Sequence, residues 1–321
     1  MTEILQKRTC SAAYTKYQIL NTPFKADVYH FNSFVSIAFN GSLAKNAVVS
    51  NHENDRECDK IWGLGFYEQF SEMVKNGKTE LEQFPVLRVP SRYYAQKFSK
   101  DFLLNVSAIS LGINLMDFPV GFSERQCRHH NDVWNILLPS RMDIYQKGHD
   151  IALRACAILA NLNLPFKLIC SGAKPGNRAN VLKVEELAND LGIGNYIECK
   201  RWDDMRKAYD EADLVISPER FCSYGLSVSE SLALGKTTIL SDIPTYQEIG
   251  TSCPNAVFFP SEDHEALARA IVSVCSENRE TEREMIRFRM QNDLRRCASL
   301  YADEYLNLLG NNPIPDEKEP I

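Results

Sequence analysis

Several features that would classify a protein at once are missing from this sequence of 321 residues. No apolar stretch approaches the ~20 residues that a membrane-spanning helix needs, and no signal-peptide pattern opens the chain. The ten cysteines are scattered without a CxxC pair, as expected of buried, reduced thiols. Basic residues are outnumbered, with 36 Lys and Arg against 42 Asp and Glu, which argues against a dedicated nucleic-acid binder. We therefore expect a cytoplasmic protein, with contact to a membrane surface left open.

The composition that remains is that of a soluble globular protein, with 44% hydrophobic and 24% charged residues. At ~100–200 residues per domain, the length predicts two domains. We place their boundary in the polar run at residues 123–134, which gives an N-terminal domain over 1–125 and a C-terminal domain over 126–310. The last residues, 311–321, are rich in proline and charge and are expected to be disordered.

The first half alternates short β-prone runs with longer stretches of helical spacing, such as residues 61–74. This alternation predicts βαβ units and a parallel sheet. Residues 1–24 lack strong periodicity, and a helix is the one element that we propose there. The strands of this half are predicted over residues 26–31, 47–51, 86–90 and 106–109.

The second half shows regular β/α alternation with short connections, which predicts a doubly wound parallel sheet. Its helical stretches place apolar residues on one face, as Ile151, Ala155, Ile158 and Leu159 illustrate. The strands are predicted over residues 134–138, 166–170, 196–199, 214–216 and 237–240. The helices are predicted over residues 149–162, 181–191, 203–212, 226–234, 264–277 and 281–309.

Two cations follow the first strand of this second half. Arg141 and Lys147 lie beyond its carboxyl end, where ligands bind in parallel sheets, and Gly148 allows a close approach of the chain to the next helix. An arginine offers a bidentate fork and a lysine a mobile point charge, a pair that suits a diphosphate. The alternative interpretation is a pair of solvated surface cations.

A second candidate site follows a later strand and opens a helix, over residues 217–230. Gly225 allows backbone N–H groups at the start of that helix to face a bound anion. Glu230 falls among apolar residues of the helix, where a carboxylate needs a partner. A pair of ligand hydroxyls or a structural arginine would serve equally well.

The ordered string of motifs in the second half resembles the nucleotide-sugar half of family 4 glycosyltransferases. The resemblance implies the GT-B fold, in which two Rossmann-like doubly wound domains face each other across a cleft, here with the N-terminal domain reduced. That half matches more loosely, and residues 1–26 contain no glycine where the family has a Gly-rich loop. The matching motifs are Arg141, Lys147-Gly148, Ser171-Gly172, Pro218, Tyr224-Gly225-Leu226, Glu230, Gly235 and Glu248-Ile249.

The resemblance implies three catalytic residues. Arg141 and Lys147 would hold the donor diphosphate and neutralise the charge that grows as the leaving group departs, so that no metal ion is needed. His52, at the end of an N-terminal strand, would lie near the transferred sugar; the alternative is a loop histidine with an ordinary hydrogen-bond partner.

The resemblance also implies a donor-binding set, in which Glu230 accepts hydrogen bonds from the ribose and the backbone near Gly225 meets the sugar or phosphates. One member departs from the family, which has a glutamate where this chain has Cys222. Glu219, three residues earlier, could replace it only if the loop is rebuilt. The whole set is Glu230, Gly225, Leu226, Tyr224, Cys222 and Gly172.

The resulting expectation is a retaining, metal-independent hexosyltransferase that needs no cofactor besides its nucleotide-diphosphate sugar. The acceptor would be a glycan or a lipid-linked molecule, and residues 92–102, which are aromatic and basic, could touch a membrane. The alternative for that segment is that Phe98 and Phe102 are core residues. The alternative functions are a non-catalytic nucleotide-sugar-binding or partner subunit, suggested by Cys222 and the short N-terminal half, and a nucleotide-sugar epimerase. A partner subunit or a homo-oligomer remains open.

Overall fold

The structure is a computed structural model that describes residues 4–8, 15–19, 29–31, 47–50, 86–116, 133–173, 175–201, 204–276 and 288–309. The chain divides into two compact units. The first unit comprises Met1–Ser110 with Ala298–Ile321, and the second comprises Leu111–Cys297. The domain boundary predicted between residues 125 and 126 and the tail predicted over 311–321 lie outside the described residues and stay predictions.

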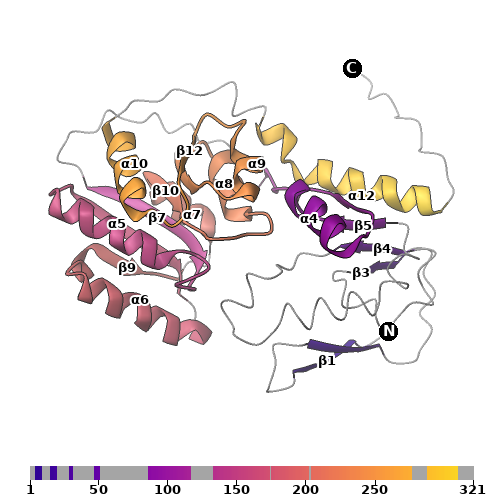
Figure 1. Cartoon of the computed structure of the whole chain (residues 1–321), viewed down its shortest axis with the longest axis horizontal. Helices are drawn as coiled ribbons and strands as arrows, with labels where there is room; N and C mark the ends of the chain where they lie inside the picture. Colours follow the sequence, from indigo (N-terminus) through magenta and orange to yellow (C-terminus); the bar gives the residue numbers. More distant parts are fainter. Residues whose placement is uncertain are drawn as a thin grey trace. The chain divides into compact units, whose positions relative to one another are not determined.

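The second unit is built on a six-stranded parallel sheet (Figure 1). Its strands are β7 (Trp134–Arg141), β8 (Phe166–Gly172), β9 (Ile197–Cys199), β10 (Leu214–Ser217), β11 (Thr238–Ser241) and β12 (Ala256–Phe259). Across the sheet they run in the order β12-β11-β10-β7-β8-β9. This is the strand order of a Rossmann-type sheet, in which the chain starts at the centre, moves to one edge and then returns to fill the other half.

Helices connect these strands, as the alternating pattern predicts. They are α5 (His149–Asn161), α6 (Arg178–Asp190), α7 (Met205–Glu211), α8 (Leu226–Ala233), α9 (Pro244–Gly250) and α10 (His264–Ser276). Short 3-10 turns at Pro175–Asn177 and Gly194–Tyr196 precede α6 and β9. Of the elements of this sheet and its helices, α9 and β12 are the two that the sequence did not predict.

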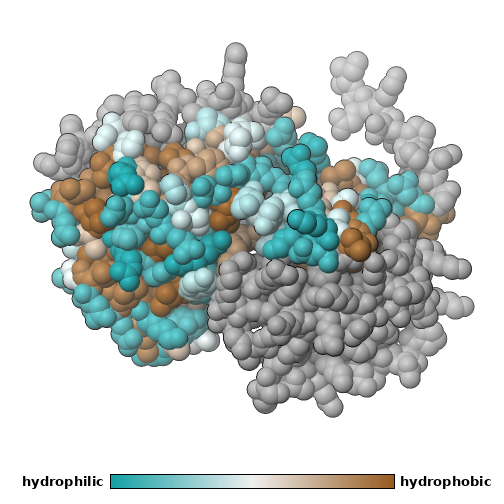
Figure 2. Space-filling view, viewed as in Figure 1, coloured by the Kyte–Doolittle hydropathy of each residue, from teal (hydrophilic) through white to brown (hydrophobic). Residues whose placement is uncertain are grey.

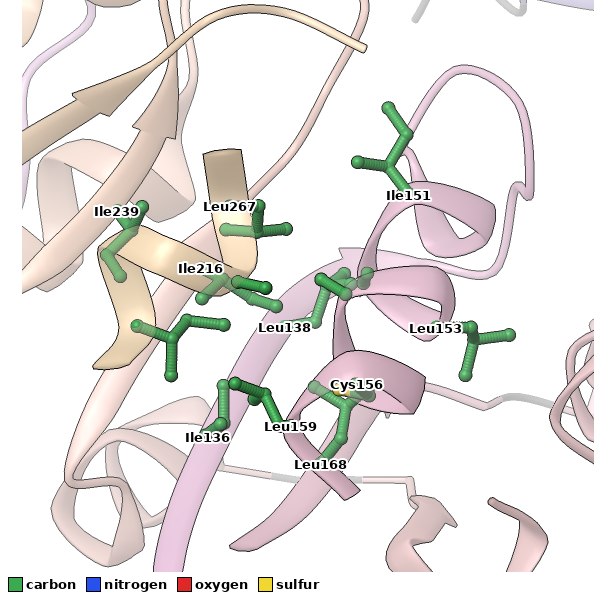
Figure 3. Packing of buried hydrophobic residues seen from close by; sticks show 14 of the residues in the cluster. Ile136, Leu138, Ile151, Leu153, Cys156, Leu159, Leu168, Ile216, Ile239 and Leu267 are labelled. Carbon is green, nitrogen blue, oxygen red and sulfur yellow. The ribbon is translucent and has the colours of Figure 1, made fainter. Parts of the chain in front are cut away.

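The core of the second unit follows the two-residue period of its strands. Ile136 and Leu138 of β7 pack in one cluster with residues of α5, α6 and α10. Figure 3 shows Leu159 and Cys156 of α5 lying against this face of the sheet. The intervening Leu137 packs on the opposite face, with residues of α7. Successive strand residues point to opposite faces, so both faces of a doubly wound sheet are apolar and both are covered by helices.

The first unit contains a four-stranded parallel sheet and a two-stranded antiparallel one. The parallel strands lie side by side in chain order. Phe98, in the helix between the third and fourth of these strands, is 2% exposed, which confirms it as a core residue. The strands are β1 (Ile4–Arg8), β2 (Thr15–Ile19), β3 (Tyr29–Phe31), β4 (Ala47–Ser50), β5 (Val86–Val89) and β6 (Val106–Ala108). Its helices are α4 (Arg92–Phe102) and the greater part of α12 (Leu294–Leu308), whose residues up to Cys297 belong to the second unit.

Two expectations for secondary structure are wrong. The helix proposed within residues 1–24 is replaced by β1 and β2, which pair in antiparallel register, and the alternation of Thr15, Tyr17 and Ile19 with polar residues explains the second strand. The helix predicted over 281–309 is interrupted at residues 292–293. Ile113 causes the break, because it donates to the carbonyl of Asn292 (2.7 Å) and accepts from the N–H of Leu294 (2.9 Å).

The described surface and helices bear on two further expectations. Figure 2 shows polar and apolar residues interspersed over the visible face of the second unit. Among the described helices, none combines the length and the apolar character needed to span a bilayer. Among the cysteines that the structure describes, five are buried free thiols, as expected of packing residues: Cys156, Cys170, Cys222, Cys253 and Cys297.

Candidate functional site

The candidate site lies where the strand order reverses, between β7 and β10. In such sheets ligands bind in the crevice outside the carboxyl ends of the two strands that flank this point. The segment after β7, residues 141–148, is called the cation loop below, and the segment after β10, residues 218–225, the carboxylate loop. Both predicted loops therefore lie at one edge of one sheet.

The two loops are in direct contact. Gly148 adopts φ +67°, and a Cβ at this position would lie 2.0 Å from the carbonyl oxygen of Pro218. The backbone N–H of Arg220 donates to the carbonyl of Gln146 at 3.0 Å. The guanidinium of Arg220 also donates to Asp150 of α5 at 2.9 and 2.8 Å, and lies 4.4 Å from the ring of Tyr145. These links fix the geometry of the candidate site without any ligand.

Arg141 is the exposed cation of the site. It is the last residue of β7, its side chain is 53% exposed, and its guanidinium donates to the side-chain oxygen of Gln146. Asp143 lies 3.8 Å away. A guanidinium has five N–H donors, so these contacts leave it the capacity to bind an anion.

Lys147 is the enclosed cation. Its ammonium lies 2.7 Å from the Glu219 carboxylate, and the two side chains are 15% and 1% exposed. Burial is the largest influence and lowers the pKa of Lys147, but the charge and hydrogen bond of Glu219, together with Cys222, raise it, so that the pKa lies above its ordinary value. Lys147 is therefore a charged ammonium at neutral pH, although most of its side chain is covered.

Glu219 is surrounded by hydrogen-bond donors. The Cys222 thiol and the Tyr246 hydroxyl both contact its carboxylate, and the Tyr246 hydroxyl also lies 2.9 Å from Ser217. Burial, followed by the charge of Glu219, raises the pKa of the Cys222 thiol to about 12. The thiol is therefore neutral and available as a donor. The carboxylate loop thus brings Glu219 next to the position where the family has a glutamate and this chain has Cys222.

Gly172 ends β8 beside Arg141, its register partner in β7. A Cβ at Gly172 would lie 2.0 Å from the carbonyl oxygen of Ser140. A larger residue would push apart the strand ends that carry Arg141. Gly172 therefore acts on the site through the backbone, with no side chain to offer a ligand.

The start of α8 follows the predicted pattern. Gly225 caps the helix with φ +98°, and Leu226 begins it with a half-exposed side chain. Tyr224 is buried, and its hydroxyl donates to the side-chain oxygen of Asn292 at 3.0 Å. The hydroxyl of Tyr224 is thus engaged by Asn292, and the role of its backbone toward a donor stays a prediction.

Glu230 has a hydrogen-bond partner that the sequence did not suggest. The hydroxyl of Tyr209, in α7, donates to its carboxylate at 3.0 Å and to the carbonyl of Ser227 at 3.0 Å. Burial raises the pKa of Glu230 above its ordinary value, and the hydrogen bond from Tyr209 opposes that shift. One carboxylate oxygen is thus held by Tyr209, so no structural arginine is required.

His149 is a buried residue of the site region that the sequence did not single out. It opens α5 directly after Gly148, and its Nδ1 lies 3.0 Å from the carbonyl of Asp143. Its side chain is fully buried, and burial lowers its pKa to about 4. The imidazole is therefore neutral near pH 7 and adds no charge to the two cations.

Two further predictions concern His52 and a metal ion. His52 lies outside the described residues, so its catalytic role stays a prediction. Within the described ranges no group of three His, Cys, Asp or Glu side chains is arranged to hold a metal ion. Sequence reasoning missed Gln146, Tyr209 and the Arg220–Asp150 pair. The polar tip of Tyr209, on a helix face that is otherwise apolar, was the one available signal.

The six-stranded parallel sheet of the second unit is of the type found in GT-B proteins, and comparison with known proteins gives the family of the chain. A family model described as "Glycosyl transferases group 1" matches residues 124–289, just over half of the chain. The chain therefore belongs to the group 1 glycosyltransferases, and the resemblance to family 4 enzymes of the GT-B fold is confirmed. Members of this family bind nucleotide sugars and glycan acceptors.

Two curated relatives and one solved structure are similar to the chain. An uncharacterized glycosyltransferase of Methanocaldococcus jannaschii is 26% identical over 183 residues, which are 54% of this chain and 45% of the relative. The lipopolysaccharide core biosynthesis mannosyltransferase LpcC of Rhizobium leguminosarum bv. viciae is 26% identical over 180 residues, 52% of this chain and 49% of the relative. The matched segment thus spans less than half the length of either relative.

Sucrose-phosphate synthase from Thermosynechococcus elongatus has a similar structure, with a TM-score of 0.74 at 19% sequence identity. The alignment covers 88% of this chain and 74% of the synthase. At this identity the similarity shows the α/β fold of GT-B glycosyltransferases, which confirms the predicted fold class.

Proposed function

We propose that the chain transfers a hexose from a nucleotide-diphosphate sugar to a hydroxyl of a glycan or lipid-linked acceptor, with retention of configuration and without a metal ion. The observation that supports this most is the pair of cations at the switch point of the sheet. Arg141 is exposed and Lys147 is kept charged by Glu219. A diphosphate is the anion that two such cations match.

Transfer would then proceed with the two cations on the leaving group. The acceptor oxygen forms a bond to the anomeric carbon while the bond from that carbon to the phosphate oxygen breaks. The acceptor proton passes to an oxygen of the departing diphosphate. Arg141 and Lys147 stabilise the negative charge that grows there, which is the electrostatic contribution expected to dominate.

The remaining residues of the set would position the donor. Glu230 keeps one carboxylate oxygen beyond its hydrogen bond to Tyr209, and that oxygen would accept from the ribose hydroxyls. The backbone of Tyr224, Gly225 and Leu226, at the start of α8, would meet the sugar or the phosphates. The acceptor class is supported by the printed name of the Rhizobium relative, which builds a lipopolysaccharide core.

A second candidate is a nucleotide-sugar-binding subunit that does not catalyse transfer. The buried Cys222 favours it, because a neutral thiol cannot take the part of a carboxylate toward a sugar. Arg141, Lys147 and Glu230 would then bind the nucleotide, and a partner chain would supply what is missing.

A thermal-shift screen of UDP, GDP and ADP sugars on the full chain, followed by NMR of the products, separates these two functions. The cognate donor should stabilise the protein by about 2.7 kcal/mol at a concentration 100 times its Kd. NMR of the products should then show a transferred or released sugar with the anomeric configuration of the donor. Binding without transfer or hydrolysis would support the non-catalytic subunit, and inversion at the anomeric carbon would contradict the retaining mechanism. The absence of any shift would contradict both functions.

A further inference from the structure

The ion pair between Glu219 and Lys147 connects residues that are 72 positions apart in the sequence. Glu219 is 1% exposed, and a carboxylate so deeply buried is costly unless charged or polar groups pair with it. Its partners come from three elements: Lys147 of the cation loop, Cys222 of its own loop and Tyr246 of α9. The Glu219–Lys147 ion pair is therefore held in place by residues of three separate elements.

The pair is not needed to hold the loops together. Arg220 already joins them through its backbone bond to Gln146 and its paired bonds to Asp150. The close approach of Gly148 to Pro218 adds a further contact. Glu219 thus has a purpose other than joining the loops, and its distinguishing property is the negative charge that it places against Lys147.

We propose that Glu219 is a positioning residue of the nucleotide-sugar site, which keeps the Lys147 ammonium ionised and fixed at the carboxyl edge of the sheet so that it can bind the donor diphosphate. The proposal rests on the proposed function, because it concerns how Lys147 binds the donor. The effect of Glu219 on the charge of Lys147 can be measured whether or not that function holds. The ammonium has three N–H donors, and Glu219 occupies one position around it, which leaves donors for a phosphate oxygen.

The charges around Lys147 explain why a carboxylate is required. Burial and the nearby Arg141 both lower the pKa of Lys147, Glu219 makes the largest contribution that raises it, and Cys222 makes a smaller one. Cys222 and Tyr246, which also face Glu219, are neutral near pH 7, because burial raises the pKa of each. His149, the next residue but one, is neutral as well. Without Glu219, burial and Arg141 would lower the pKa of Lys147 further.

The first test measures the pKa of Lys147 without any ligand. Labelling with acetic anhydride across a pH series, followed by mass spectrometry of the peptide that contains Lys147, gives this value for the full chain. The wild-type pKa should lie above the ordinary 10.5. Glu219→Gln keeps the size of the side chain and removes its charge, so the pKa of Lys147 should fall below the wild-type value.

Glu198→Gln is the matched control. Glu198 forms an ion pair with Lys167, at 2.5 Å, but both side chains are substantially exposed and neither contacts Lys147. This variant removes the same charge from the same unit and should leave the pKa of Lys147 unchanged. Glu219→Asp, which retains a carboxylate, should keep the pKa of Lys147 closer to the wild-type value than Glu219→Gln does.

The second test links the pair to the donor. UDP, GDP and ADP are titrated by calorimetry at pH 7 and pH 9.5, and the affinity of Glu219→Gln should fall more with pH than that of the wild type or Glu198→Gln. A merely structural role of Glu219 would change the affinity equally at both pH values. Failure of the wild type to bind any of the three would contradict the proposed function, while the labelling experiment would still decide the role of Glu219.

Two results would overturn the proposal. One is a Lys147 pKa that is the same in Glu219→Gln as in the wild type. The other is a wild-type pKa below 10.5, which would show that burial outweighs Glu219. Since the second result needs no variant, the proposal can be rejected even if Glu219→Gln does not fold.

Discussion

The cation loop and the carboxylate loop follow equivalent strands of one sheet but contribute opposite kinds of group. The cation loop supplies Arg141 from the end of β7 and Lys147 from the segment that precedes α5. The carboxylate loop supplies Glu219, a buried acid, and Gly225, a helix cap with positive φ. Neither loop is complete alone, because Lys147 of the first loop pairs with Glu219 of the second. The charge of Lys147 depends on an acid that the chain reaches only after three further strands.

The two cations of the first loop differ just as much. Arg141 is half exposed and its contacts lie within its own loop, whereas Lys147 is covered and paired across to the second loop. The first arrangement suits a residue that is free to move toward a ligand. The second suits a residue whose position is set before the ligand arrives. Under the proposed function, the two phosphates of the donor would each meet a different kind of cation.

The largest expected difference between Lys147 and Arg141 is in the free energy of unfolding that is lost when each is replaced. Lys147→Ala leaves Glu219 buried without its cation, and breaking a buried ion pair in this way costs about 3 kcal/mol or more. Arg141→Ala removes an exposed side chain and should change the free energy of unfolding by less than about 0.5 kcal/mol. Urea unfolding of both variants measures the difference. Equal losses would mean that the two cations are not distinguished by burial.

A somewhat smaller effect should follow from widening the contact between the loops. Gly148→Ala forces a side chain into a left-handed conformation and against the Pro218 carbonyl, at a cost of about 2–3 kcal/mol. Gly192→Ala is the matched control, because Gly192 has φ +72° with no atom within 4 Å of the added Cβ. Its cost should be the conformational strain alone, about 1 kcal/mol. If thermal unfolding gives the two variants the same stability, the loops are not in close contact.

The smallest effect concerns pH and His149, the neutral histidine at the first position of α5. The pKa of His149 is lowered by burial from 6.5 to about 4, so the unfolded chain binds a proton in this range and the folded chain does not. Stability is therefore lost as the pH falls below 6.5, by about 2 kcal/mol between pH 7 and pH 5.

The control for this pH effect is His149→Gln, which removes the titrating group. The loss of unfolding free energy between pH 7 and pH 5 should be about 2 kcal/mol smaller in this variant than in the wild type. Urea unfolding at the two pH values measures it. If both proteins lose the same amount, His149 is not the buried neutral group described above.

The sequence predicted the second unit well because its signals are local. The strand over residues 134–138 and the helix over 149–162 have clear periodicity, and the structure has β7 and α5 at these places. Arg141, Lys147 and Gly225 were found from the rule that ligands bind beyond the carboxyl ends of parallel strands. This rule needs only the order of strands and helices.

The features that sequence reasoning missed depend on residues far apart in the chain. The break at residues 292–293 is made by the backbone of Ile113, which no local pattern can reveal. The partner of Glu230 is Tyr209 on another helix, and the partner of Lys147 is Glu219 in another loop. Burial decides which of these groups are charged, and burial is known only once the chain is folded.

The central claim is that the two cations at the switch point hold a diphosphate. Calorimetric titration of UDP, GDP and ADP into the wild type and Arg141→Ala at the same pH tests it most directly, because Arg141→Ala should leave the fold intact. The wild type should show one binding site, and the affinity of the variant should be at least tenfold lower, a loss of about 1.4 kcal/mol or more. Equal affinity in the two proteins would contradict it.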